Sequence, residues 1–133
     1  TPVDAQFSMP YALSVALWDG EAGLSQFSEN RIKDEDVLTL AKKVEMVVDE
    51  RLDRLYPEMW SSMIEVETTD GNKFTEKVDA PKGDPENPLT INELKQKFLS
   101  NAAPILGEKE SKALTDRILN LEQLKNMDHL QIS

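Results

Sequence analysis

The sequence of 133 residues contains no cysteine and only one histidine, His129. The lack of cysteine excludes a disulfide framework, a thiolate nucleophile and an iron–sulfur cluster ligated from within this chain. A single histidine beside Asp128 cannot form a recognisable metal site. We therefore predict no metal ligands, place His129 at the surface, and expect a reducing, cytoplasmic environment.

Positive charge is also scarce, with 15 Lys and Arg against 25 Asp and Glu. The resulting net charge of −10 offers no attraction to phosphate backbones or to anionic lipid. No apolar run approaches the roughly 18 residues that a membrane span requires. We therefore expect a folded acidic protein with neither nucleic acid nor a membrane as its partner. The length suits a single domain over residues 1–133.

The most apolar stretch lies in residues 4–20, which read DAQFSMPYALSVALWDG. Ser8 can cap a helix, Pro10 suits its first turn and Asp19-Gly20 supplies a stop, so we predict a helix of about ten residues. Its apolar side chains fall on two faces, one with Tyr11, Val15 and Trp18 and the other with Met9, Leu13 and Leu17. A helix that is apolar on two faces is buried on two faces. We expect the isolated chain to expose apolar surface along residues 9–18 and to self-associate through it.

The middle of the chain predicts a short helix followed by strands. Asp34 can cap the helix, and from Val44 to Asp49 the apolar period changes to alternation, which predicts a strand. The clearest hairpin lies at residues 62–79. A two-residue Asp-Gly loop would place its apolar faces on opposite sides, whereas a three-residue loop over 70–72 keeps them together. We predict the three-residue loop, which pairs Ile64 with Val78.

The last third of the chain predicts a connection and two helices. Residues 80–89, APKGDPENPL, contain three prolines and a glycine, so we predict an extended segment without helix. Thr90 and Glu93 form a capping box for a helix that ends near Pro104, and a last helix follows Gly107. The order of elements predicts an α+β fold in two layers, with a small antiparallel sheet of about three strands covered by helices.

No complete active site is visible in the sequence. It has no nucleophile elbow, no phosphate-binding glycine loop and no histidine paired with a carboxylate at helical spacing, so we predict no catalytic residue here. The acidic residues 34–36 are explained by the helix macrodipole. Tyr11, flanked by Gln6 and Ser8, is the polar group of the apolar opening, and a buried hydroxyl needs a partner. It either bonds to backbone within the core or faces a ligand.

Four segments, in this order and spacing, resemble the C-terminal portion of the MmgE/PrpD family: DAQFSMPYALSVALWDG, KVEMVVDE, TTDGNKF and PKGDPENPLTINELKQKF. The resemblance extends over about residues 4–128. The family includes 2-methylcitrate dehydratase of propionate metabolism, cis-aconitate decarboxylase and iminodisuccinate epimerase. The resemblance implies that this chain is the smaller, lid-like α+β domain of a two-domain enzyme, commonly a homodimer, whose N-terminal helical domain is missing here.

The resemblance also implies a reaction without a cofactor. A proton next to a carboxylate of a small di- or tricarboxylic acid is removed, and loss of water, loss of carbon dioxide or reprotonation follows. We therefore expect part of a lyase of the dehydratase kind, inactive as the isolated segment. The family's acid–base residues do not map onto this sequence. The tyrosine of its FSxxY-like segment, thought to border the substrate, matches Tyr11, and with Gln6 and Ser8 it completes the predicted substrate-binding set.

The distribution of charge is consistent with a substrate site whose charged groups lie mostly outside this sequence. Residues 1–30 contain no Lys or Arg, so the cations that hold a polycarboxylate must come from elsewhere. The alternative is a non-catalytic acidic protein-interaction module. The second apolar face of the helix over 9–18 argues against that alternative, because a free domain of this size rarely needs to cover both faces.

Overall fold

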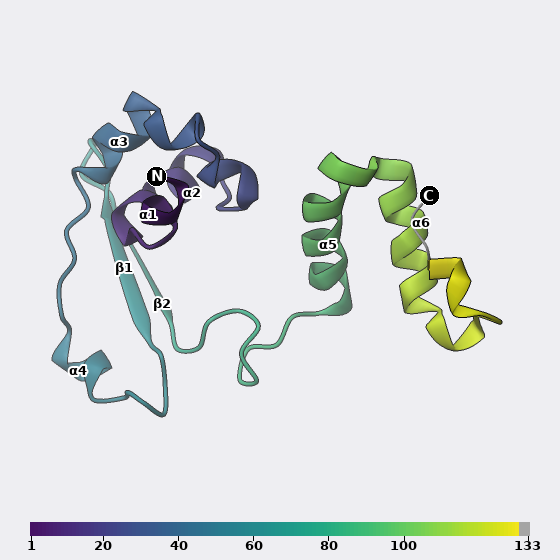
Figure 1. The fold of residues 1–133 in the computed structure, drawn as a ribbon. Coiled ribbons are helices and arrows are strands. Elements are labelled where there is room, and N and C mark those ends of the chain that lie inside the picture. The colour runs from purple at the N-terminus through teal and green to yellow at the C-terminus, as the bar shows by residue number, and fades with distance from the viewer. Residues whose placement is uncertain (131–133) are drawn as a thin grey trace. The chain divides into compact units, whose positions relative to one another are not determined.

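The chain divides into two compact units, Thr1–Val47 and Val48–Ser133, and the computed structural model describes residues 1–130. The first unit holds the helices α1 (Pro2–Gln6), α2 (Met9–Asp19) and α3 (Glu35–Ala41) and the 3-10 turns η1 (Leu24–Phe27) and η2 (Arg31–Lys33) (Figure 1). The second holds α4 (Glu50–Asp53), strands β1 (Ser62–Glu67) and β2 (Lys73–Val78), helices α5 (Ile91–Leu106) and α6 (Glu108–Leu119), and the turns η3 (Leu121–Gln123) and η4 (Met127–Leu130). The predicted α+β class is confirmed. Among the described helices, none has both the length and the apolar character needed to cross a bilayer.

Helix α2 begins and ends where the sequence predicts. The Ser8 hydroxyl accepts a hydrogen bond from the backbone N–H of Tyr11 at 3.3 Å. Pro10 lies in the first turn, where its missing N–H leaves no carbonyl without a donor. Gly20 ends the helix with a φ of 80°, a left-handed conformation that glycine adopts without strain. The caps therefore determine the length of α2 through local contacts. Helix α1, which precedes it, was not predicted.

The core of the first unit is small and lies between α2 and α3. It consists of Ala5, Tyr11, Val15 and Val37, with Phe27 and Ile32 partly buried against it. Tyr11 and Val15 are 4% and 0% exposed, which confirms one buried face of α2. Trp18, predicted on that face, is instead about half exposed, as are Met9 and Leu17 of the second face. The apolar surface expected along residues 9–18 is present, and self-association through it stays a prediction.

The strand predicted over 44–49 is not formed. The chain leaves α3 through a turn and then runs without regular structure to Asp49. Alternation determines which side chains share a face, but a strand also needs the backbone groups of a partner strand. Within residues 1–130 the sheet therefore has two strands, not about three, and every residue of β2 is exposed, so helices do not cover that strand.

Strands β1 and β2 form the predicted hairpin in a different register. Ile64 lies opposite Glu76, not Val78, so the predicted pairing is wrong by two residues. The loop has three residues, but they are 69–71, one position earlier than predicted. Gly71 has a φ of 86°, and its backbone N–H donates at 2.9 Å to the carbonyl three residues before it. A type I turn followed by a left-handed residue requires glycine at that place, and this requirement shifts the register.

The connection and the last two helices follow the prediction in part. Residues 80–89 contain no helix, but they fold into turns with an isolated bridge and are not extended throughout. Helix α5 continues through Pro104 and ends at Leu106, two residues beyond the proline near which its end was predicted. Helices α5 and α6 pack side by side across Gly107 (Figure 1). Ile91 and Leu94, two apolar residues in the first turns of α5, are exposed.

The capping box at the start of α5 is confirmed. The Thr90 hydroxyl accepts from the backbone N–H of Glu93 at 3.2 Å, and the Glu93 carboxylate accepts from the backbone N–H of Thr90 at 2.7 Å. The Lys82 ammonium lies 3.1 Å from the same carboxylate. Hydrogen bonds from Thr90 are the largest cause that lowers the pKa of Glu93 from 4.5 to about 2, followed by the bond from Lys82.

Acid is expected to weaken the first turn of α5. A carboxyl whose pKa falls on folding stabilises the folded state above its ordinary pKa, and this contribution is lost as the pH falls from 4.5 towards about 2. Nuclear magnetic resonance should therefore show the backbone amide of Thr90 shifting with a midpoint near pH 2. In Glu93→Gln this titration should be absent, whereas Glu122→Gln, with the same charge change, should retain it. A Thr90 amide that titrates alike in all three proteins would contradict the assignment.

Candidate functional site

An open hollow of about 620 Å³ lies where α1 gives way to α2. It is lined by residues 6–10, Ala12 and Met46, none of which carries a charged side chain. Phe7 ends α1 and Ser8 caps α2, so the junction of the two helices supplies most of the lining. This hollow is the candidate binding site of the first unit.

Two polar side chains are part of this mostly apolar lining. The Ser8 oxygen accepts from the backbone N–H of Tyr11 at 3.3 Å, and its own hydrogen is left to donate to a ligand. The exposed amide of Gln6 supplies further donors. The N-terminal end of α2 adds a partial positive charge at the same place. The hollow can therefore donate hydrogen bonds to one carboxylate, but it contains no full positive charge.

Tyr11 lies in the core. Its side chain is 4% exposed, and its hydroxyl donates a hydrogen bond to the backbone carbonyl of Gln26 at 2.6 Å. The ring packs at a tilt against Phe27, with the two centroids 5.6 Å apart. Burial raises the pKa of the Tyr11 phenol above its ordinary value, so the hydroxyl is a neutral donor at pH 7. The sequence left open whether this hydroxyl bonds to backbone within the core or faces a ligand. In the structure it bonds to backbone within the core.

The structure thus brings together two of the three predicted substrate-binding residues. Gln6 and Ser8 line the same hollow, whereas Tyr11 does not line it and points its hydroxyl to Gln26. Tyr11 is three positions beyond Ser8 in a helix, so its side chain leaves α2 in nearly the same direction. The hydroxyl nevertheless ends in the core, because residues 24–27 fold back over the ring.

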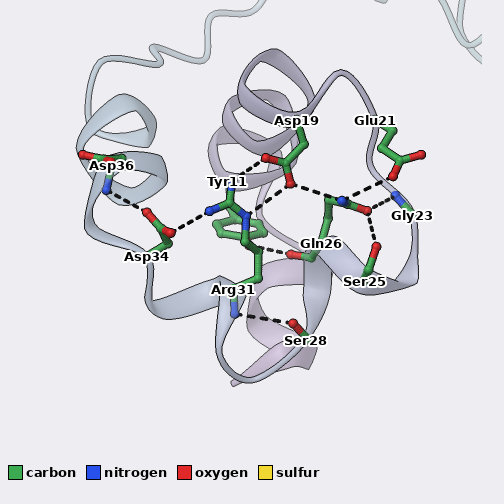
Figure 2. Close-up of polar contacts among 10 residues, drawn as sticks. All are labelled: Tyr11, Asp19, Glu21, Gly23, Ser25, Gln26, Ser28, Arg31, Asp34 and Asp36. Carbon is green, nitrogen blue, oxygen red and sulfur yellow. Dashed lines mark hydrogen bonds and ion pairs between the residues drawn. The ribbon is translucent and has the colours of Figure 1, made fainter.

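A polar network fastens this returning segment to α2. Figure 2 shows Arg31 between the carboxylates of Asp19 and Asp34. The Arg31 Nε lies 3.2 Å from Asp19 Oδ2, and its Nη1 lies 2.6 Å from Asp34 Oδ2. Gln26 Nε2 donates to Asp19 Oδ2 at 3.1 Å. One guanidinium therefore joins the end of α2 to the start of α3, and Gln26 ties the returning segment to the same Asp19 carboxylate.

The charges in this network stabilise one another. The hydrogen bond from Arg31, followed by the one from Gln26, lowers the pKa of Asp19 below its ordinary value. The hydrogen bond to Asp19 is the largest cause that raises the pKa of Arg31. Both groups stay ionised at neutral pH, so the network maintains the loop over Tyr11 and supplies no proton donor or acceptor for chemistry near pH 7.

The sequence contains one signal for this network. Arg31 is the first positively charged residue of the chain, and it follows thirty residues that contain several carboxylates. A lone cation in such a place is a strong candidate for an internal ion pair. Gln26 and Met46 carried no comparable signal, because their roles depend on how the chain returns to α2.

The described part of the chain contains no cluster of metal-ligating side chains. Residues 1–130 contain no group of three or more His, Asp or Glu side chains placed to hold an ion. Asp34 caps α3 by accepting from the backbone N–H of Asp36 at 3.0 Å, as the macrodipole argument predicts. The backbone of His129 lies in η4, and its side chain, predicted at the surface, is outside what the structure describes.

Comparison with known families is decisive for this chain. The family profile of the MmgE/PrpD C-terminal domain matches residues 1–123, which include the hollow, the network and the hairpin. The chain belongs to this family. The resemblance drawn from the four sequence segments is thereby confirmed.

Relatives of this MmgE/PrpD domain carry the name cis-aconitate decarboxylase. One from Aspergillus terreus is 30% identical over 130 residues, covering 96% of this chain and 26% of the relative. One from Mus musculus is 28% identical over 127 residues, and one from Homo sapiens is 30% identical over 127 residues. Each of these two alignments covers 92% of this chain and 25% of the relative. The chain thus spans about a quarter of the length of the relatives it matches.

Proposed function

We propose that this chain is the C-terminal domain of a cofactor-independent lyase that acts on a small tricarboxylic acid, with decarboxylation of cis-aconitate as the leading reaction. The observation that carries the proposal is the match to cis-aconitate decarboxylases over more than nine-tenths of the chain. The sequence had favoured a dehydratase within the same family. Loss of water and loss of carbon dioxide both require a carbanion next to a carboxylate, so one site architecture serves either outcome.

The proposed role of this domain is to bind and orient, not to transfer protons. Ser8 and Gln6 donate hydrogen bonds to one substrate carboxylate at the hollow. The remaining carboxylates need full positive charges, and residues 1–30 contain none. We assign those cations and the acid–base groups to a larger helical domain of the same protein, which is the proposed partner of this chain in a cytoplasmic homodimer. No residue of 1–133 is assigned a catalytic step.

In the decarboxylation, the bond between a substrate carbon and one carboxylate breaks. Carbon dioxide leaves, and the electron pair stays on the carbon, where the neighbouring unsaturation and carboxylate stabilise it. A proton then adds to that carbon chain and yields an unsaturated dicarboxylic acid that is one carbon shorter. In the competing dehydration, a base removes a proton next to a carboxylate and a hydroxyl leaves as water. The two reactions are therefore distinguished by their products.

The test is to supply cis-aconitate and 2-methylcitrate separately to the full-length gene product that contains residues 1–133, and to the isolated chain. Nuclear magnetic resonance of the products should show carbon dioxide loss from cis-aconitate by the full-length protein and no turnover by the isolated chain. The double variant Gln6→Ala/Ser8→Ala should raise KM, whereas the exposed pair Gln123→Ala/Ser100→Ala should not.

Other outcomes revise the proposal in defined ways. Dehydration of 2-methylcitrate without decarboxylation would keep the lyase and replace its leading reaction. No turnover of either acid, together with capture of a partner protein, would favour the non-catalytic interaction module. A coding sequence without a helical domain would also contradict the proposal, because the hollow lacks the charges that such a substrate needs.

A further inference from the structure

Met46 lines the hollow from a distant part of the sequence. The other lining residues come from the junction of α1 and α2, whereas Met46 follows α3. A turn after α3 directs the chain towards the hollow, with two backbone hydrogen bonds: Lys43 N–H to Leu40 O at 2.9 Å and Val44 N–H to Ala41 O at 3.2 Å. Since α3 packs against α2 through the core, the position of Met46 relative to Ser8 depends on contacts that are well buried.

Met46 is not a core residue. Its side chain is 70% exposed, so its position in the lining contributes little to the stability of the first unit. Its thioether is apolar, so it offers the hollow a contact surface that carries no charge and no hydrogen-bond donor. The polar donors of the hollow, Ser8 and Gln6, come from the helix junction, and Met46 adds an apolar contact from a separate segment.

We propose that Met46 is a specificity-determining residue, which limits the size of the substituent on the substrate's carbon chain. This inference rests on the proposed function, because it takes the substrate carboxylate to lie at Ser8 and Gln6. The carbon atoms next to that carboxylate then lie beside Met46, and no residue that lines the hollow carries a charged side chain. An apolar side chain discriminates between ligands that differ by one methyl group about 10-fold or more.

The test compares cis-aconitate with its methyl-substituted analogue in the full-length gene product. Met46→Ala enlarges the hollow, so the ratio of kcat/KM for the methylated acid to that for cis-aconitate should rise about 10-fold. Met46→Leu, which conserves volume, should leave the ratio near the wild-type value. If the methylated acid is not turned over, its inhibition constant against cis-aconitate replaces its kcat/KM. Thermal unfolding of both variants should match the wild type, since the side chain is exposed.

Val47→Ala is the matched control. Val47 is adjacent, 84% exposed and not part of the lining, so its truncation should leave the ratio unchanged. A ratio that Met46→Ala does not move, or that Val47→Ala moves equally, overturns the role of Met46 and leaves the proposed function standing. A wild-type protein that neither converts nor binds either acid overturns the proposed function and, with it, this inference.

Discussion

Replacement of Val15 by Asp is expected to unfold the first unit. Val15 is 0% exposed and packs with Ala5, Tyr11 and Val37, which are the whole buried apolar cluster of residues 1–47. An aspartate there loses the apolar burial and places a carboxyl in a cluster that contains no cationic side chain. The cost is roughly 4 kcal/mol or more, which is comparable to the total stability of a unit this small. Hydrogen exchange should show loss of amide protection throughout α2 and α3.

Val47→Asp is the control for this experiment, because it changes net charge by the same amount at a side chain that is 84% exposed. Surface substitutions of this kind usually change the free energy of unfolding by about 0.5 kcal/mol or less. Val15→Ala should be intermediate, at about 2 kcal/mol, since it removes buried methyl groups without adding charge. Equal protection of α2 in Val15→Asp and Val47→Asp would show that α2 does not use this face as its core.

Local chemistry explains why the helix ends were predictable. The Ser8 cap, the Gly20 stop and the Thr90–Glu93 box each involve residues within four positions of one another, so the sequence contains the complete interaction. Pro104 shows the limit of such reasoning. A proline disfavours helix at the residue before it, but α5 continues to Leu106 and includes the proline in its last turn.

Pairing between distant segments was less predictable. Residues 44–49 alternate as a strand does, yet no partner strand lies beside them in the described structure. The hairpin shows the same difficulty on a smaller scale. Its apolar pattern is satisfied by any even shift, so the pattern placed the correct faces together while leaving the register open. The backbone conformation of Gly71 decides between the remaining registers, and that conformation is a property of the turn.

The same contrast between local and distant contacts applies to the candidate site. Gln6 and Ser8 were predicted because they lie beside Tyr11 in a recognisable segment, and both line the hollow. The place of Met46 in the lining was not predicted, because it depends on the packing of α3 against α2. The direction of Tyr11 was also undetermined, because its hydroxyl partner belongs to a carbonyl fifteen positions later. A buried hydroxyl predicts that a partner exists, but it does not say which element supplies it.

These contacts show that different residues at the start of α2 line the hollow and form the core. The first turn of α2 presents Ser8 to the hollow, whereas Tyr11 and Val15 lie in the core. The Arg31 network fastens the segment that supplies the Tyr11 partner to the C-terminal end of α2, outside the hollow. A substitution in the network is therefore expected to alter binding only through the position of Ser8.

Tyr11→Phe separates these two roles. The structure predicts a loss of about 1–2 kcal/mol in the free energy of unfolding, because the carbonyl of Gln26 loses its donor in a buried place. Tyr11→Ala also removes the ring packed against Phe27 and should cost about 3–5 kcal/mol. Below the unfolding temperature, KM and kcat of the full-length Tyr11→Phe protein should equal those of the wild type. Urea denaturation and steady-state kinetics on the same preparations measure both quantities.

The decisive contrast is between Tyr11→Phe and Ser8→Ala. Both remove one hydroxyl, and the two positions are three residues apart in α2. If Tyr11 acts through the core, Tyr11→Phe lowers stability without moving KM, whereas Ser8→Ala raises KM in addition to the loss of the cap, which costs about 1 kcal/mol. If Tyr11→Phe instead raises KM and leaves the free energy of unfolding unchanged, the phenol faces the substrate in the working enzyme. The bond to Gln26 would then have to break when substrate binds, because the phenol has a single hydrogen to donate.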